Sequence, residues 1–147
     1  MKNLWKHVVA AGLAVAVIGA GVTPASADVV KDRQMAMKSL SKANKALGKA
    51  AKAGDAAAAQ KQAMMIVAAS DKLEALFPKG SGAGYGEKHQ SKADIWKDWD
   101  KFQKANAAMK AAAQKVASGD LKAAGDIGKT CGGCHKPFRG PKIKKKM

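Results

Sequence analysis

The stretch LKAAGDIGKTCGGCHKPF, residues 121–138, decides the fold of this 147-residue chain. Its apolar, small and sulfur-bearing residues recur at alternating spacings of three and four, which predicts a helix with one inward face. These residues are Leu121, Ala124, Gly128, Cys131, His135 and Phe138. Two thiols and an imidazole therefore share the face that would turn toward a protein core.

Residues 131–135, Cys-Gly-Gly-Cys-His, carry the pattern for covalent attachment of a c-type haem. Each thiol can add across one vinyl group of the haem, and the adjacent imidazole then lies beneath the iron as an axial ligand. The motif therefore predicts one covalent haem c, attached through Cys131 and Cys134, with His135 as a metal ligand.

Other uses of a Cys-x-x-Cys pair fit less well. A closed zinc site needs four ligands, and beyond His135 the chain offers only His7 and His89 as further histidines. A thioredoxin-type pair should follow a strand, whereas the residues before Cys131 predict a helix. A simple disulfide is the third alternative, and the histidine directly after Cys134 favours haem over it.

Residues 1–27 resemble a secretory signal peptide. Lys2 and Lys6 precede an apolar run over residues 8–22, and Ala25-Ser26-Ala27 has the small-residue pattern of a cleavage site. A membrane anchor is the alternative, but the apolar run is short and is interrupted by glycines. We expect cleavage before Asp28 and export to a bacterial periplasm, where c-type haem is attached.

The chain is strongly basic, with a formal charge of +16. Removal of Lys2 and Lys6 with the signal peptide lowers this charge by two, to +14. Such a charge suits nucleic acid, an acidic membrane surface or an acidic protein. Export argues against nucleic acid, and no stable membrane insertion is expected once the signal is removed. Residues 142–147 form a basic tail, either a frayed end or a site for an acidic redox partner.

Four helices are predicted in one domain over residues 28–141, separated by three breaks. The helices are expected at about 29–53, 56–76, 91–117 and 120–139. Gly54-Asp55 and Gly119-Asp120 each supply a glycine that ends one helix and an aspartate that caps the next. Phe77-Pro78 and a glycine-rich loop form the middle break, and Ser91 is expected to cap the third helix. The fold class is therefore all-α, a four-helix bundle with covalently bound haem in its core.

The mature chain resembles the class II cytochromes c, the cytochrome c′ family. The resemblance rests on the haem motif near the C-terminus and on short matches elsewhere. These matches are Arg33–Lys38, Leu76–Pro78, Gly80–Gly82, Ile95-Trp96, Phe102 and Phe138-Arg139. The resemblance implies an antiparallel up-down-up-down bundle with the haem near one end. It also implies that Arg33 and Gln34 approach the haem propionates and that Arg139 lies near the proximal face.

The resemblance places Met37 on the distal side of the iron, opposite His135. In the low-spin members of the family a methionine at this position binds the iron, which raises its potential and closes the sixth coordination position. In the high-spin members an apolar residue packs over the iron without a bond. The Met37-Lys38 pair favours the Met-ligated form. His89 could supply a second histidine ligand, but a lone loop histidine is more often solvated.

Two functions follow from these alternatives. The first is a periplasmic electron carrier that is not an enzyme and that meets acidic redox partners. The second is a five-coordinate, high-spin cytochrome c′ that binds or buffers small gases such as NO and CO. A homodimer is possible, since many members of the family pair through their first two helices.

Overall fold

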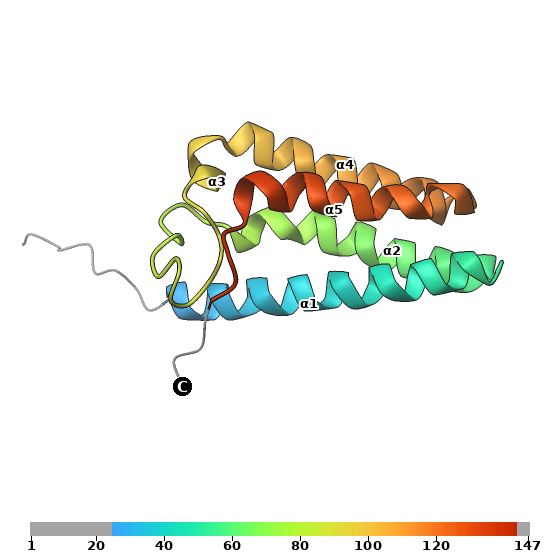
Figure 1. Cartoon of the computed structure of the whole chain (residues 1–147), viewed down its shortest axis with the longest axis horizontal. Coiled ribbons are helices and arrows are strands. Elements are labelled where there is room, and N and C mark those ends of the chain that lie inside the picture. The colour runs from blue at the N-terminus through green and yellow to red at the C-terminus, as the bar shows by residue number, and fades with distance from the viewer. Residues whose placement is uncertain (1–24, 144–147) are drawn as a thin grey trace, which may run out of the picture.

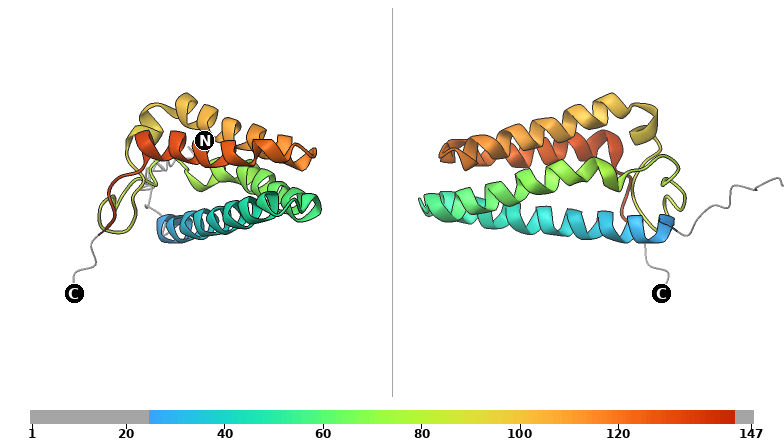
Figure 2. Two further views of the ribbon diagram at one scale, coloured as in Figure 1. Left: turned by 45° about the vertical axis from the view of Figure 1, so that its right-hand side comes forward. Right: turned by 180° about the vertical axis from the view of Figure 1, so that it is seen from behind.

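The computed structural model describes residues 25–143 and shows a bundle of four long helices (Figure 1). In order, the elements are α1 (Ala25–Lys52), α2 (Ala56–Leu73), the 3-10 turn η1 (Glu74–Leu76), α3 (Asp94–Lys97), α4 (Trp99–Ala117), η2 (Leu121–Ala123) and α5 (Ala124–Phe138). The predicted all-α bundle is confirmed, and residues 25–143 contain no strand, only isolated bridges. The figures show α1, α2, α4 and α5 side by side, with α3 and the glycine-rich loop at one end (Figure 2).

The two predicted helix junctions at Gly54-Asp55 and Gly119-Asp120 are present. Gly54 and Gly119 have φ angles of 71° and 104°, the left-handed region that glycine adopts without a steric cost. The Asp55 side chain accepts a hydrogen bond from the Ala58 backbone N–H at 2.9 Å, which caps α2. Asp120 accepts from the Lys122 N–H at 3.1 Å, and a 3-10 turn then leads into α5.

The predicted start of the third helix is wrong. Ser91 caps no helix, because its segment runs alongside the end of α5: the Lys92 N–H donates to the Phe138 carbonyl at 2.9 Å. The chain then forms one turn, α3, and breaks at Asp98, whose φ and ψ are −126° and 64°. The Asp98 carboxylate accepts from the Lys101 N–H at 3.2 Å, so α4 has its own cap.

Small and aliphatic side chains make the centre of the bundle. The side chains of Leu47, Ala59, Ala63, Ala113 and Val116 are fully buried, and the alanines let the helices approach closely. Methionine in a helical seam is usually core filler, which predicts burial of Met64, Met65 and Met109. Met109 lies in this core, but Met64 and Met65 are more than half exposed, at 57% and 52%, because Ala63 and Ile66 occupy the inward face of α2.

The inward face of α5 differs in part from the predicted one. Phe138 is buried as expected, but Ile127, and not the exposed Gly128, is the buried residue one turn before the motif. Cys131 and Cys134 are half-buried and pack against the edge of the core. The helix therefore presents its thiols at the boundary between the core and the space beside it.

The first helix begins at Ala25, three residues before the predicted mature start at Asp28. The remainder of the predicted signal peptide, residues 1–24, lies outside the described residues, as do residues 144–147 of the predicted tail. No helix within residues 25–143 is long and apolar enough to span a bilayer.

Candidate functional site

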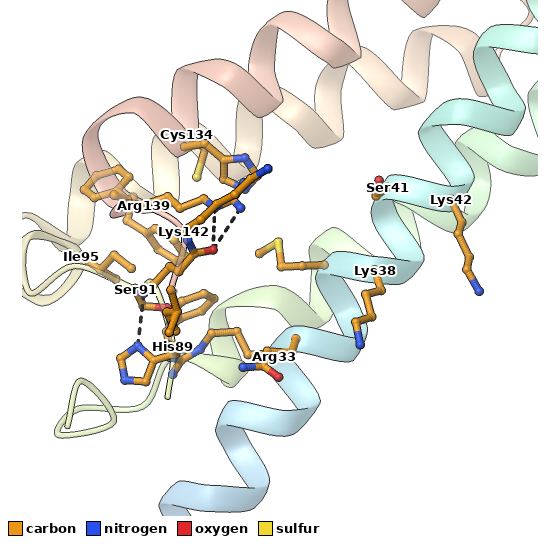
Figure 3. Close-up of a pocket in the computed structure, with 18 residues that line it drawn as sticks. Arg33, Lys38, Ser41, Lys42, His89, Ser91, Ile95, Cys134, Arg139 and Lys142 are labelled. Atoms are coloured by element: carbon orange, nitrogen blue, oxygen red, sulfur yellow. Dashed lines mark hydrogen bonds between the residues drawn. The ribbon is translucent and has the colours of Figure 1, made fainter. Parts of the chain in front are cut away.

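A cavity of about 800 Å³ lies at the loop end of the bundle, with walls from α1, the α3 region and the end of α5 (Figure 3). Its volume falls within the range of small-molecule and cofactor sites. Phe77, Phe102 and Phe138 supply apolar aromatic walls, and Phe102 lies 4.8 Å and 5.6 Å from the other two rings, measured between centroids. The cavity is therefore suited to a large, flat and mainly apolar group.

The haem motif on α5 faces this cavity. Cys134 and His135 line it, while Cys131 is half-buried one turn earlier. Burial raises the pKa of the Cys131 thiol, and it raises that of Cys134 to about 11, so both thiols are protonated at neutral pH. Burial, and secondarily the charge of Arg139, lowers the pKa of His135, which keeps the imidazole neutral and able to offer a lone pair to a metal.

Within the described part of the chain, the motif residues do not join a conventional metal cluster with other side chains. Among the described residues, no group of three or more histidine, cysteine or acidic side chains could hold a metal ion.

Met37 enters the same cavity from α1. Its side chain is half-buried and lines the cavity together with His135 of α5. The exposed Met35, two residues earlier, does not line the cavity. The structure thus brings Met37 and His135 to one cavity from two different helices.

Arg33 lies one turn before Met37 and is almost completely buried, with 3% of its surface exposed. Its Nε donates to the Leu76 carbonyl at 3.0 Å, and its two terminal nitrogens donate to the hydroxyls of Ser91 at 3.1 Å and Ser81 at 2.8 Å. Arg33 therefore joins α1 to both ends of the glycine-rich loop. Sequence reasoning assigned no role to Ser81 and only that of a helix cap to Ser91.

The charge of Arg33 has no carboxylate partner among residues 25–143. Burial lowers its pKa to about 10, which still leaves the guanidinium charged at neutral pH. A buried cation is costly unless an anion or several hydrogen bonds compensate it. Because Arg33 also lines the cavity, the site fits a group that is apolar and flat but carries an anionic substituent, as haem does with its propionates.

His89 is not solvated, contrary to the sequence expectation. It is 3% exposed, and its Nδ1 accepts from the Ser91 N–H at 3.2 Å while its Nε2 lies 2.8 Å from the Ala83 carbonyl oxygen. Both ring nitrogens are therefore engaged by the loop backbone. The glycine-rich loop folds around this histidine, which removes the support for His89 as a second iron ligand.

Gln34 and Arg139 line the cavity, but their side chains bond to the loop. Gln34 donates to the Lys88 carbonyl at 3.0 Å. The exposed Arg139 donates from Nε and a terminal nitrogen to the Gln90 side-chain oxygen at 3.1 Å and 3.0 Å, as Figure 3 shows. These bonds hold residues 88–90 at the edge of the cavity, between α1 and α5.

A haem-attachment motif on the last helix, opening into a cavity at one end of a four-helix bundle, defines a bundle-type c-type cytochrome. The profile of the family described as Cytochrome C' matches residues 28–139. The chain belongs to the cytochrome c′ family, and its cofactor is haem c, bound covalently through Cys131 and Cys134.

Individual relatives agree with this assignment. The chain is 41% identical over 91 residues to the cytochrome c′ of Pararhodospirillum photometricum, which covers 56% of this chain and 71% of the relative. A solved mutant of cytochrome c′ from Rhodopseudomonas palustris matches at a TM-score of 0.67 and 31% identity, over 78% of this chain and 98% of that one. A nitric oxide complex of a mutant cytochrome c prime from Alcaligenes xylosoxidans matches at 0.67 and 25% identity, over 80% and 97%.

Proposed function

We propose that this chain is a periplasmic electron carrier whose single haem c has His135 and Met37 as its axial ligands. The observation that carries the proposal is the entry of Met37 and His135 into one cavity from α1 and α5. Imidazole with thioether is a ligand pair of electron-transfer cytochromes, and the thioether raises the reduction potential. When bound, haem c would supply one-electron redox chemistry between the ferric and ferrous states of its iron.

The protein would contribute ligands for the iron, a fixed orientation of the haem and surroundings that exclude water. His135 presents a neutral imidazole, and two protein ligands would limit the structural change that accompanies each electron. Arg33 would bind a propionate through its remaining N–H groups, since its partners in the structure, one carbonyl and two hydroxyls, are all neutral oxygens. Phe77, Phe102 and Phe138 would exclude water from the haem, which influences the potential.

We infer that the protein is not an enzyme. Among residues 25–143 no aspartate or glutamate lines the cavity, so this part of the chain does not supply the carboxylate pair that general acid–base chemistry often uses. The buried His89 is held by two backbone groups and is not available as a general base. The arrangement supports binding and electron exchange.

Gas binding is the second candidate function. One observation favours it: a nitric oxide complex of a mutant cytochrome c prime from Alcaligenes xylosoxidans is a structural match of this chain. If Met37 packs over the iron without a bond, the sixth position would be open to a small gas such as NO or CO. Whether Met37 binds the iron therefore distinguishes the two functions.

An optical spectrum of the ferric holoprotein decides between them. With Met37 bound, we expect a low-spin spectrum with the weak long-wavelength sulfur-to-iron band, and loss of that band in Met37→Ala. Met35→Ala is the matched control, because Met35 lies on the same helix but outside the cavity. A high-spin spectrum that Met37→Ala leaves unchanged would contradict Met ligation and favour the gas-binding alternative.

Pairing of two copies stays a prediction. The exposed Met64 and Met65 give α2 an apolar outer surface that a second copy could cover. Sedimentation at micromolar concentration, with Met64→Lys as the comparison, would measure it: a dimer should dissociate in the variant.

A further inference from the structure

Among residues 25–143, the charged side chains at the rim of the cavity are all positive. Besides the buried Arg33, four exposed cations line the cavity, and no aspartate or glutamate of residues 25–143 does. We call these four residues the mouth cations: Lys38 and Lys42 on α1, and Arg139 and Lys142 after α5. Figure 3 shows the two pairs on opposite walls, one from α1 and one from the end of the chain.

None of the mouth cations takes part in an ion pair among residues 25–143. The three ion pairs in this part of the chain involve other lysines, namely Lys92, Lys110 and Lys129. Arg139 bonds only to the neutral side chain of Gln90. The positive charge of the mouth is therefore not compensated by acidic side chains of the protein itself.

The C-terminal chain adds to this charge. Lys142 is the first residue of the predicted basic tail, and the structure places it on the rim of the cavity. The sequence continues with Lys144, Lys145 and Lys146, which lie outside the described residues. Lys142 and α1 thus contribute to one charged surface, a relationship that their distance in the sequence did not reveal.

We propose that the mouth cations form a docking surface for an acidic patch on a redox partner protein. The inference rests on the proposed electron transfer and assigns the place where it occurs. Complementary charge raises the rate of encounter and orients the partner toward the cavity. A protein patch can place separate carboxylates against both pairs of cations, which come from opposite walls of the haem site.

The first test compares two double variants. Lys38→Gln with Lys42→Gln removes two mouth cations, and Lys45→Gln with Lys49→Gln removes two exposed lysines of equal spacing. The second pair lies on the same helix face, about 10 Å further from the cavity. Both variants lose the same charge, and glutamine is a good helix former. They therefore differ in the position of the lost charge.

The ferrous holoproteins are oxidised in a stopped-flow instrument by ferricyanide, an anion, and by a cationic tris-phenanthroline cobalt complex. Loss of Lys38 and Lys42 should lower the rate of oxidation by ferricyanide about five- to tenfold at low ionic strength. It should not lower the rate of oxidation by the cobalt complex. Loss of Lys45 and Lys49 should lower the rate of oxidation by ferricyanide less than about twofold. The difference should vanish near 0.5 M salt, where screening is strong.

The second test uses a peptide of glutamates as the acidic protein probe and phosphatidylserine vesicles as the lipid probe. The peptide should inhibit ferricyanide oxidation of the wild type and of the Lys45/Lys49 variant, and should lose this effect in the Lys38/Lys42 variant. Equal slowing of both variants, or dependence on Lys38 and Lys42 for vesicle binding alone, would overturn the docking surface. Failure of both oxidants to react with any form would instead contradict the proposed electron transfer itself.

Discussion

The guanidinium carbon of Arg33 lies 4.2 Å from the centroid of the Phe77 ring. The same carbon is 5.8 Å from the Trp96 ring, so the buried cation of α1 meets two aromatic rings from the middle of the chain. Cation–π contacts of this kind are stronger when the cation is removed from water. Together with the bonds from Arg33 to Ser81 and Ser91, they fix the glycine-rich loop against the wall of the cavity.

Arg33→Lys should therefore loosen this end of the bundle while keeping the charge. Lysine cannot reproduce the three divergent hydrogen bonds or the planar stacking on Phe77. We expect the free energy of unfolding of the holoprotein to fall by about 2–4 kcal/mol. Chemical denaturation followed by circular dichroism would measure the loss.

Arg139→Lys is the matched control, since it changes an arginine that also lines the cavity but is exposed. Its bonds to Gln90 are open to solvent, so its substitution should cost less than about 1 kcal/mol. Equal losses in the two variants would show that the buried contacts of Arg33 do not contribute beyond those of a surface arginine.

His89→Ala tests whether the loop histidine has a structural role. The substitution leaves the Ser91 N–H and the Ala83 carbonyl without their partner, which should destabilise the holoprotein by about 1–3 kcal/mol. The ferric spectrum should stay unchanged, because both nitrogens of His89 are committed to the loop. A change in the spin state of the iron on this substitution would support His89 as a second histidine ligand.

Much of the fold could be predicted because its signals are local. Gly54-Asp55 and Gly119-Asp120 end and begin helices through backbone angles and caps that depend on a few neighbouring residues. The buried rows of α2 and α4 follow from three-and-four spacing alone. The haem motif is equally local, since Cys131, Cys134 and His135 lie within five residues of one helix.

The parts that the sequence did not predict depend on contacts between distant residues. Ser91 has the pattern of a helix cap, yet its segment pairs with the end of α5, 48 residues away at Arg139. His89 is polar and lies among glycines, and only the folded loop shows that it is buried. Likewise, the position of Lys142 and Lys38 at one cavity follows from the packing of the helices and not from any motif.

The ion pair between Lys129 and Asp126 gives a pH prediction. Lys129 donates to the Asp126 carboxylate at 2.8 Å and, through this hydrogen bond and its charge, lowers the pKa of that carboxyl. Because the pKa is lower in the folded state, the pair stabilises the protein above about pH 4, the ordinary range of an aspartate, and this contribution is lost as the pH falls through the folded pKa.

NMR titration of the Asp126 carboxyl carbon measures the effect. In Lys129→Gln the pKa should rise toward its ordinary value, whereas Lys122→Gln, which removes another lysine from the same end of the bundle, should leave it in place. Since the pair is exposed, the change in overall stability should be small. A pKa of Asp126 that does not respond to Lys129→Gln would contradict the pair.

Export and cleavage have a direct test. Mass spectrometry of the protein from the periplasmic fraction of an expressing bacterium should give a chain that begins at Asp28 and carries the mass of one haem. Replacement of Ala27 by a bulky residue should block cleavage, because the processing site requires small side chains. A mature chain that retains residues 1–27 would support the membrane-anchor alternative instead.

The two cysteines should contribute one covalent bond each. Cys131→Ser and Cys134→Ser should each retain haem through the remaining thioether, with one vinyl group left intact and a corresponding red shift of the pyridine haemochrome spectrum. The double variant should lose haem staining on a denaturing gel. Without the covalent tether, its cavity of about 800 Å³ would hold haem only through ligands and packing, so the melting temperature should become dependent on added haem. Covalent haem in the double variant would contradict attachment at this motif.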